Sequence, residues 1–168
     1  MKIKIVPQLR NECEADIEII CVIKKDLGHR WIEDKETLQL LGFEGGQDQT
    51  CLLAQSKRIY VGSDSINHDN IRSAYAAAIK ALRNTKVENV KTALYLGENL
   101  TQNLQAMVEG MILGDYEFDT YKTEKAKHPV KNVTIAAEDF NGKDIDIEQA
   151  KRAVEDAIKV AEATNFTR

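Results

Sequence analysis

The amino-acid sequence predicts an α/β fold in which a mixed β-sheet carries helices on both faces. Strand-like and helix-like segments alternate from about residue 58 onward, which is typical of layered α/β sheets. The 168 residues contain no internal repeat, low-complexity tract or Pro/Gly-rich linker, and this length matches one domain. We therefore treat residues 1–168 as a single domain.

The first part of the chain is expected to form two strands and a short helix. Residues 2–6 alternate polar and apolar before Pro7, which predicts a strand near a sheet edge. Residues 16–23 are richer in apolar β-branched side chains and predict a more buried strand. Residues 35–41 can form a short helix, because Leu38 and Leu41 share one side of it.

A hairpin and a strand that flank a helix are expected next. Residues 50–54 and 58–61 are separated by three polar residues, so they predict two antiparallel strands. Asp69 can cap a helix that runs to about residue 83, with apolar residues at the spacing of one helical face. Residues 90–96 then predict another strand.

The last part of the chain predicts two helices with a strand between them. The first helix starts at Thr101 and is expected to end at Gly114. Residues 130–136 read as a strand. Asp146 followed by Gln149 resembles a capping box, and it opens a helix with an alanine-rich apolar stripe.

Composition narrows the class of protein. The formal net charge is −4 and the pI is near 5.5, which argues against nucleic-acid binding. No apolar segment approaches the ~20 residues that span a bilayer, and no signal segment is evident at the N-terminus, so we expect a soluble, cytoplasmic protein. Three scattered cysteines predict free thiols, with Cys21 and Cys51 as small core residues.

A search for catalytic motifs finds almost nothing. The three histidines, His29, His68 and His128, share no metal-ligand spacing, and each is expected to be a single surface histidine near a turn. No nucleophile elbow or Walker loop is present. The turn after Gly62 could offer backbone N–H groups to an anion, but it is a generic strand–loop–helix junction.

The densest polar and aromatic cluster lies between residues 109 and 122. Gly110 falls inside a predicted helix, where a glycine costs stability and usually marks close packing against another backbone. Two interpretations stay open. The cluster either pins a helix end to the sheet through aromatic side chains, or forms a packing or interface element with required side chains.

The same cluster resembles a signature of the leucyl aminopeptidase (cytosol aminopeptidase) family, near the end of its N-terminal domain. The residues that carry the resemblance are Glu109, Gly110, Leu113, Gly114, Tyr116, Phe118, Asp119, Tyr121 and Lys122. Residues 59–62, 72–78 and 161–168 resemble further segments of that domain in order and spacing. The resemblance covers the chain from about residue 50, whereas the first 50 residues match only in element order.

The resemblance implies a macro-domain-like α/β fold and a role in a larger enzyme. The family releases N-terminal amino acids such as Leu from peptides, with two divalent metals, commonly zinc or manganese, bound by a C-terminal catalytic domain. None of those ligand motifs occurs here, so no catalytic, metal or cofactor residue is carried over and this domain is expected to be non-catalytic, structural or regulatory. Family members form hexamers, and an isolated N-terminal domain is expected to be monomeric or weakly associated.

Two alternatives remain at this point. A free-standing macro-type module would bind a nucleotide or ADP-ribose, with the Gly62 turn as its one plausible loop. DNA binding is known for some bacterial relatives of the family, but the acidic balance disfavours it, and the lysines of residues 122–131 read as a solvated loop. The helix that ends at residue 168 has no Gly or Pro stop, so we expect the sequence to be part of a longer chain.

Overall fold

A single six-stranded mixed sheet organises the protein. The computed structural model describes residues 1–94, 99–116, 123–124 and 127–167. The strand order is β1-β6-β5-β2-β4-β3, and all neighbours are parallel except β3, which runs antiparallel to β4. The strands are β1 (Lys2–Val6), β2 (Ile17–Ile23), β3 (Thr50–Leu53), β4 (Arg58–Ser63), β5 (Asn89–Leu94) and β6 (Asn132–Asp139). The prediction of a mixed sheet is confirmed.

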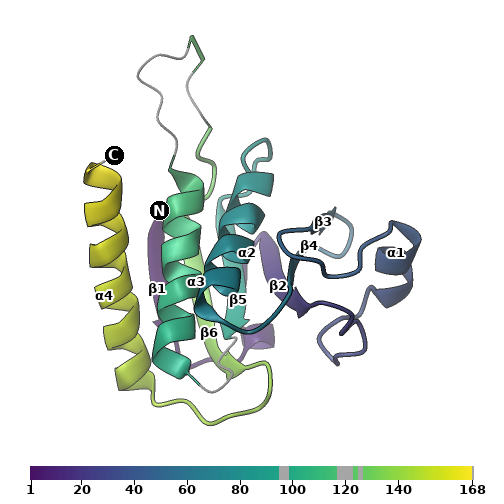
Figure 1. Ribbon diagram of the computed structural model, residues 1–168, viewed down its shortest axis with the longest axis horizontal. Helices are drawn as coiled ribbons and strands as arrows, with labels where there is room; N and C mark the ends of the chain where they lie inside the picture. The colour runs from purple at the N-terminus through teal and green to yellow at the C-terminus, as the bar shows by residue number, and fades with distance from the viewer. Residues whose placement is uncertain (95–98, 117–122, 125–126, 168) are drawn as a thin grey trace.

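Helices cover both faces of this sheet, as the sequence predicts. The helices are η1 (Arg10–Glu12, a 3₁₀ turn), α1 (Lys35–Leu40), α2 (His68–Ala81), α3 (Leu100–Asp115) and α4 (Ile147–Phe166). The three long helices α2, α3 and α4 lie side by side over one face (Figure 1). The short helix α1 lies against the opposite face, near the β3 end of the sheet.

Alternation along the central strands builds a separate core on each face. Ile19 of β2 is in register with Ile59 of β4, and both pack under the long helices. Ile20 is in register with Tyr60, and both face Leu38 of α1 in the second core. Because successive strand residues point to opposite faces, an apolar run such as residues 19–22 can serve both cores at once.

Strands β2 and β5 separate along their length. They pair only between Ile17–Ile19 and Val90–Thr92, although both strands continue beyond these residues. The chain leaving β2 runs toward β3 and β4, whereas the chain leaving β5 runs the other way toward β6. Such a reversal is the point at which open α/β sheets form a ligand crevice beyond the carboxyl ends of the strands.

Local signals explain most of the element boundaries. The hairpin of β3 and β4 is confirmed, and Lys57 in its turn has a positive φ of 57°. Asp146 caps α4 as predicted, because its side chain accepts hydrogen bonds from the Glu148 and Gln149 N–H groups. The predicted cap at Asp69 is wrong. Asn67 has the extended backbone of a cap and accepts from the Asn70 N–H, so α2 begins earlier.

None of the helices in the described part of the chain is both long and apolar enough to cross a membrane.

Candidate functional site

The first half of the signature segment forms the contact between helices α2 and α3. Gly110 and Gly114 lie one turn apart on α3 and are buried. A Cβ atom at Gly114 would lie 2.6 Å from the Ala76 carbonyl oxygen of α2, and one at Gly110 would crowd the Arg72 backbone. The glycines therefore let the two helix backbones approach more closely than any side chain allows. Gly114 does not end α3, which continues to Asp115.

An ion pair and a hydrogen-bonded arginine flank this helix contact. The Arg72 Nε donates to Oε2 of Glu109 at 3.0 Å, and the Glu109 side chain is 19% exposed. Arg83, just beyond α2, donates from Nη2 to the carbonyl oxygens of Gly114 and Tyr116 at 2.7 and 3.2 Å. These bonds satisfy carbonyl groups at the end of α3, where no helical N–H remains to bind them.

The rest of the signature is only partly described. Leu113 is half-buried on α3, and Tyr116 is the C-cap of that helix. Tyr116 lines a hollow of about 310 Å³ beside Asp115, His128 and the end of α4. Phe118, Asp119, Tyr121 and Lys122 lie outside the described residues.

Aromatic side chains fill the crevice between β2 and β5. Trp31, which lies between β2 and α1, packs edge-on against Phe140 at 5.0 Å between ring centroids. His29 stacks on Phe140 and meets Trp31 at 5.5 Å. The cavity left beside Trp31, Phe140 and Thr92 holds only about 10 Å³. That is too small for anything beyond a single water molecule.

Two hydrogen bonds set the tautomer of His29. Its Nδ1 accepts from the Trp31 backbone N–H at 3.2 Å, so the proton is on Nε2, which donates to the Phe140 carbonyl oxygen at 2.8 Å. Burial lowers the pKa of His29, because the charged ring is poorly solvated there. His29 lies near a turn, as predicted, but its ring is half-buried against Phe140 and Trp31.

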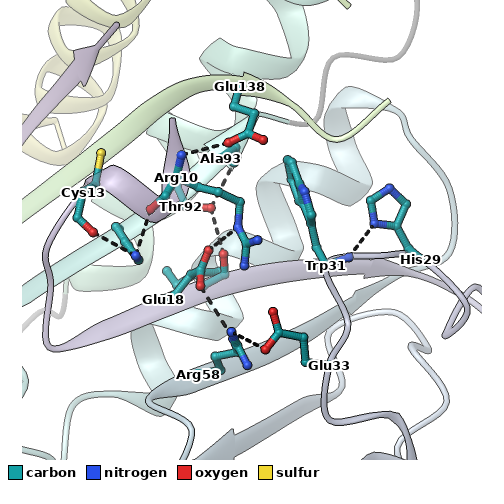
Figure 2. A network of polar contacts seen from close by, with 12 residues as sticks. Arg10, Cys13, Glu18, His29, Trp31, Glu33, Arg58, Thr92, Ala93 and Glu138 are labelled. Carbon is teal, nitrogen blue, oxygen red and sulfur yellow. Dashed lines mark hydrogen bonds and ion pairs between the residues drawn. The ribbon is translucent and has the colours of Figure 1, made fainter. Parts of the chain in front are cut away.

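A buried charge cluster lies next to the aromatic cluster (Figure 2). Glu18 of β2 is 7% exposed and accepts from Arg10 Nε at 2.6 Å, while Arg58 Nε of β4 lies 3.6 Å from its other oxygen. Arg58 also pairs with Glu33 at 3.1 Å. The Arg10 guanidinium lies 5.0 Å from the ring centroid of Trp31, so it links the charge cluster to the aromatic one.

Backbone contacts hold the segment between β1 and β2 against the sheet. The Arg10 N–H donates to a Glu138 carboxylate oxygen at 2.8 Å. The Lys91 ammonium donates to the carbonyl oxygens of Arg10 and Cys13, both at 2.8 Å. Residues of strands β5 and β6 thus hold the backbone of Arg10 in place, and its side chain extends from there to Glu18 (Figure 2).

Sequence reasoning missed both clusters. A weak signal was available, because Glu18 interrupts an apolar strand and such a residue needs a partner when buried. The sequence did not show that Arg10 and Arg58 are the partners of Glu18, and the aromatic cluster joins His29 to Phe140, which are 111 residues apart.

The remaining predicted positions are separate from these clusters. His68 is at the exposed start of α2, and His128 lies 3.2 Å from Asp115. Within the described ranges, no three His, Cys, Asp or Glu side chains are placed to hold a metal ion together. The residues therefore do not fit a metal centre in this part of the chain.

The Gly62 turn is packed by the protein itself. Gly62 lies within β4 and not in the turn, and a Cβ there would crowd the backbone of Gly45 and Gly46, so this end of β4 packs against that loop. The Asp64 carboxylate accepts from the Gln47 N–H at 3.1 Å. Asn67 caps the helix that follows. An anion at this turn would therefore meet the negative Asp64 carboxylate and a helix N-terminus whose N–H group is already bonded to Asn67, which disfavours an anion site.

The cysteines behave as structural thiols. Cys13 and Cys21 are buried and Cys51 is half-buried, and all three are free. Burial raises the pKa of Cys21 to about 12 and raises the pKa values of the other two thiols. A thiol with a raised pKa is a poor nucleophile near neutral pH.

Fold and site together define a mixed α/β domain whose ligand crevice is closed by its own side chains. Residues 35–125 match the sequence pattern described as "Cytosol aminopeptidase family, N-terminal domain". The chain belongs to this family.

Curated relatives extend the match to almost the whole sequence. A probable cytosol aminopeptidase of Wolinella succinogenes is 35% identical over 158 residues, which cover 94% of this chain and 32% of the relative. One from Campylobacter jejuni is 28% identical over 168 residues, which cover 100% of this chain and 34% of the relative. The chain thus spans about a third of the length of these relatives.

Solved structures share the fold. A mutant of tomato leucine aminopeptidase matches with a TM-score of 0.69 and 16% identity, over 96% of this chain and 36% of that chain. The bottromycin maturation enzyme BotP matches with a TM-score of 0.67 and 21% identity, over 92% of this chain and 32% of that chain. At these identities the comparison establishes the fold alone.

Proposed function

We propose that this chain is the non-catalytic N-terminal domain of an aminopeptidase that releases N-terminal amino acids such as Leu from peptides. Family membership and relatives three times as long support the proposal. The chemistry would come from two divalent metals, zinc or manganese, bound by residues outside this sequence. The domain itself would act through contacts with that catalytic part.

The filled crevice is the observation that carries the non-catalytic role. The point where β2 and β5 part is the usual ligand position of an open α/β sheet, and here Trp31, His29 and Phe140 occupy it. The same observation disfavours the nucleotide-binding or ADP-ribose-binding alternative, because that ligand needs a pocket of several hundred Å³.

The arginine–carboxylate cluster supports a scaffold role. It joins η1, β2, β4 and β6 through side chains that are mostly buried, and the α2–α3 contact joins the helical layer in the same way. Rigid elements of this kind suit a domain that positions others. We propose assembly with the catalytic part of the enzyme, within a homohexamer and in the cytoplasm.

Hydrolysis of leucine p-nitroanilide by the purified 168-residue chain tests the proposal. We expect no turnover above the buffer rate with added Mn²⁺ or Zn²⁺, and no stoichiometric binding of either metal. Activity that comigrates with the 18.9-kDa chain would contradict the proposal. The charge-cluster variant Glu18→Ala separates the sources of any activity, since a contaminating host peptidase is indifferent to it.

A second titration addresses the ligand-binding alternative. Calorimetry with ADP-ribose at millimolar concentration is expected to give no binding heat. Saturable binding heat with ADP-ribose would restore the macro-type interpretation.

A further inference from the structure

The turn that follows β6 contains an asparagine followed directly by a glycine. Asn141 and Gly142 are both exposed, and no other asparagine of the 168-residue sequence precedes a glycine. Asparagine is chemically labile, and a following glycine increases its lability. The reason is that glycine has no Cβ to shield the backbone nitrogen that attacks the asparagine side-chain amide. The turn is therefore a candidate site of spontaneous modification.

The structure leaves the space around this pair open. Residues 141–144 are all exposed. Apart from its chain neighbours, Gly142 has no heavy atom within 4 Å of the position that a Cβ would take. Its φ of 77° is in the left-handed region, which favours glycine at this reversal of the backbone. In the described part of the chain, nothing packed against Gly142 thus blocks the Asn141 amide from its nitrogen.

Hydrogen bonds to Asp139 hold the turn closed. The Gly142 N–H donates to the Asp139 carbonyl oxygen at 3.0 Å. The N–H groups of Asn141 and Lys143 donate to the Asp139 Oδ2 at 3.0 and 2.9 Å. The Gly142 nitrogen must leave its bond before it attacks. An exposed turn opens at a small part of the cost of global unfolding, so the attack takes place in a chain that is otherwise folded.

We propose that Asn141 is a modification site that converts spontaneously to aspartate and isoaspartate, and that isoaspartate there opens the crevice between β2 and β5. The Gly142 nitrogen bonds to the Asn141 Cγ, the bond from Cγ to Nδ2 breaks, and the Gly142 amide proton leaves with the departing ammonia. A water molecule then opens the cyclic imide. Cleavage of the new bond to Cγ gives aspartate, and cleavage of the original peptide bond gives isoaspartate, with no change of oxidation state.

The backbone of Phe140 connects the turn to the aromatic cluster. Phe140 directly precedes Asn141 and is 3% exposed. Its N–H donates to the Leu94 carbonyl oxygen at 2.9 Å, and its carbonyl oxygen accepts from His29 at 2.8 Å. Isoaspartate carries the backbone through Cβ and Cγ, which adds one backbone atom next to Phe140. The short turn has no room for this atom, so the Phe140 ring shifts and water reaches Trp31.

The negative charge by itself does not have this effect. Both products place a carboxylate at position 141, which is exposed and solvated. Aspartate keeps the ordinary backbone, and a change at an exposed position usually has a small effect on the folded state. The two products therefore separate the effect of the charge from the effect of the longer backbone.

Peptide mapping by mass spectrometry tests the modification. The 168-residue chain is incubated in mildly alkaline buffer at physiological temperature. Asn141 should gain about 1 Da in two separable products. Asn84 is the internal control, because it is also exposed but is followed by Thr85. The β-branched Thr85 hinders attack, so conversion at Asn141 should be at least about tenfold faster. Equal rates at the two asparagines, or no conversion at Asn141, would overturn the proposal.

Gly142→Ala tests the attacking group. The added methyl group shields the nitrogen and should slow conversion of Asn141 at least about tenfold. Gly28→Ala is the matched control, because its Cβ position is equally open and it lies far from Asn141 in the sequence, so it should leave the rate unchanged. An unchanged or faster rate in Gly142→Ala would contradict attack by this nitrogen.

The emission of Trp31, the chain's single tryptophan, tests the link to the crevice. Deamidated protein carries one more negative charge and is separated from the parent by ion exchange. Its emission should shift to longer wavelength, because water reaches the indole. Asn141→Asp carries the same charge on an ordinary backbone and should keep the parent emission. An unshifted spectrum of the deamidated protein, or an equal shift in Asn141→Asp, would refute the role of the longer backbone.

Discussion

Replacement of Gly114 by alanine tests the close approach of α2 and α3. The new Cβ would lie 2.6 Å from the Ala76 carbonyl oxygen and 2.7 Å from the Ala76 Cα, whereas ordinary contact begins at 3.4 Å. Both neighbours are backbone atoms, so neither can rotate away as a side chain would. The two helices must therefore separate by about 0.8 Å, and a packed interior resists such a shift.

Two opposing effects decide the magnitude. Overpacking of this kind costs about 1–3 kcal/mol, partly because a gap of about 0.5–1 Å weakens the neighbouring contacts. Alanine in place of glycine favours a helix interior by about 1 kcal/mol, and less in the last turn where Gly114 lies. We expect a net loss of about 1–2 kcal/mol, which lowers the melting temperature by about 2–8 °C.

Urea and thermal unfolding measure this loss directly. Gly110→Ala should act in the same direction, because its Cβ would crowd the Arg72 backbone. Gly28→Ala is the matched control, since no heavy atom lies within 4 Å of its Cβ position, and it should change stability by less than about 0.5 kcal/mol. If Gly114→Ala instead raised stability, helix propensity would dominate and the close approach would be refuted.

Three further predictions concern the buried charge cluster and the aromatic cluster. Glu18→Ala leaves the Arg10 guanidinium without its carboxylate and should cost about 3 kcal/mol in urea unfolding, while an unchanged midpoint would contradict the buried pair. Phe140→Ala should cost about 3 kcal/mol and shift Trp31 emission to longer wavelength, because water reaches the opened crevice; unshifted emission would show that the crevice stays closed. Burial lowers the pKa of His29, so below its ordinary value of 6.5 the unfolded chain binds a proton that the folded chain resists. Stability should therefore fall from about pH 7 to about pH 5, and less steeply in His29→Gln; equal slopes would exclude His29 as the cause.

Short-range patterns in the sequence predicted much of the fold correctly. The β3–β4 hairpin follows from two apolar segments with three residues between them, and the start of α4 follows from Asp146 and its spacing to Gln149. These features depend on groups only a few residues apart, so the chain order alone specifies them. The cap of α2 was missed because Asn67 and Asp69 are both capable of the role, and the backbone conformation decides between them.

The identity of the chain as a cytosol aminopeptidase N-terminal domain was also readable from the order of residues, because a signature is a property of order and spacing. What those residues do was decided by tertiary structure. Gly110 and Gly114 gain their meaning only when α2 lies against α3, and the closed crevice exists only when Phe140 meets a segment more than 100 residues away. Contacts between distant segments depend on the path of every element between them, and no local pattern of residues encodes that path.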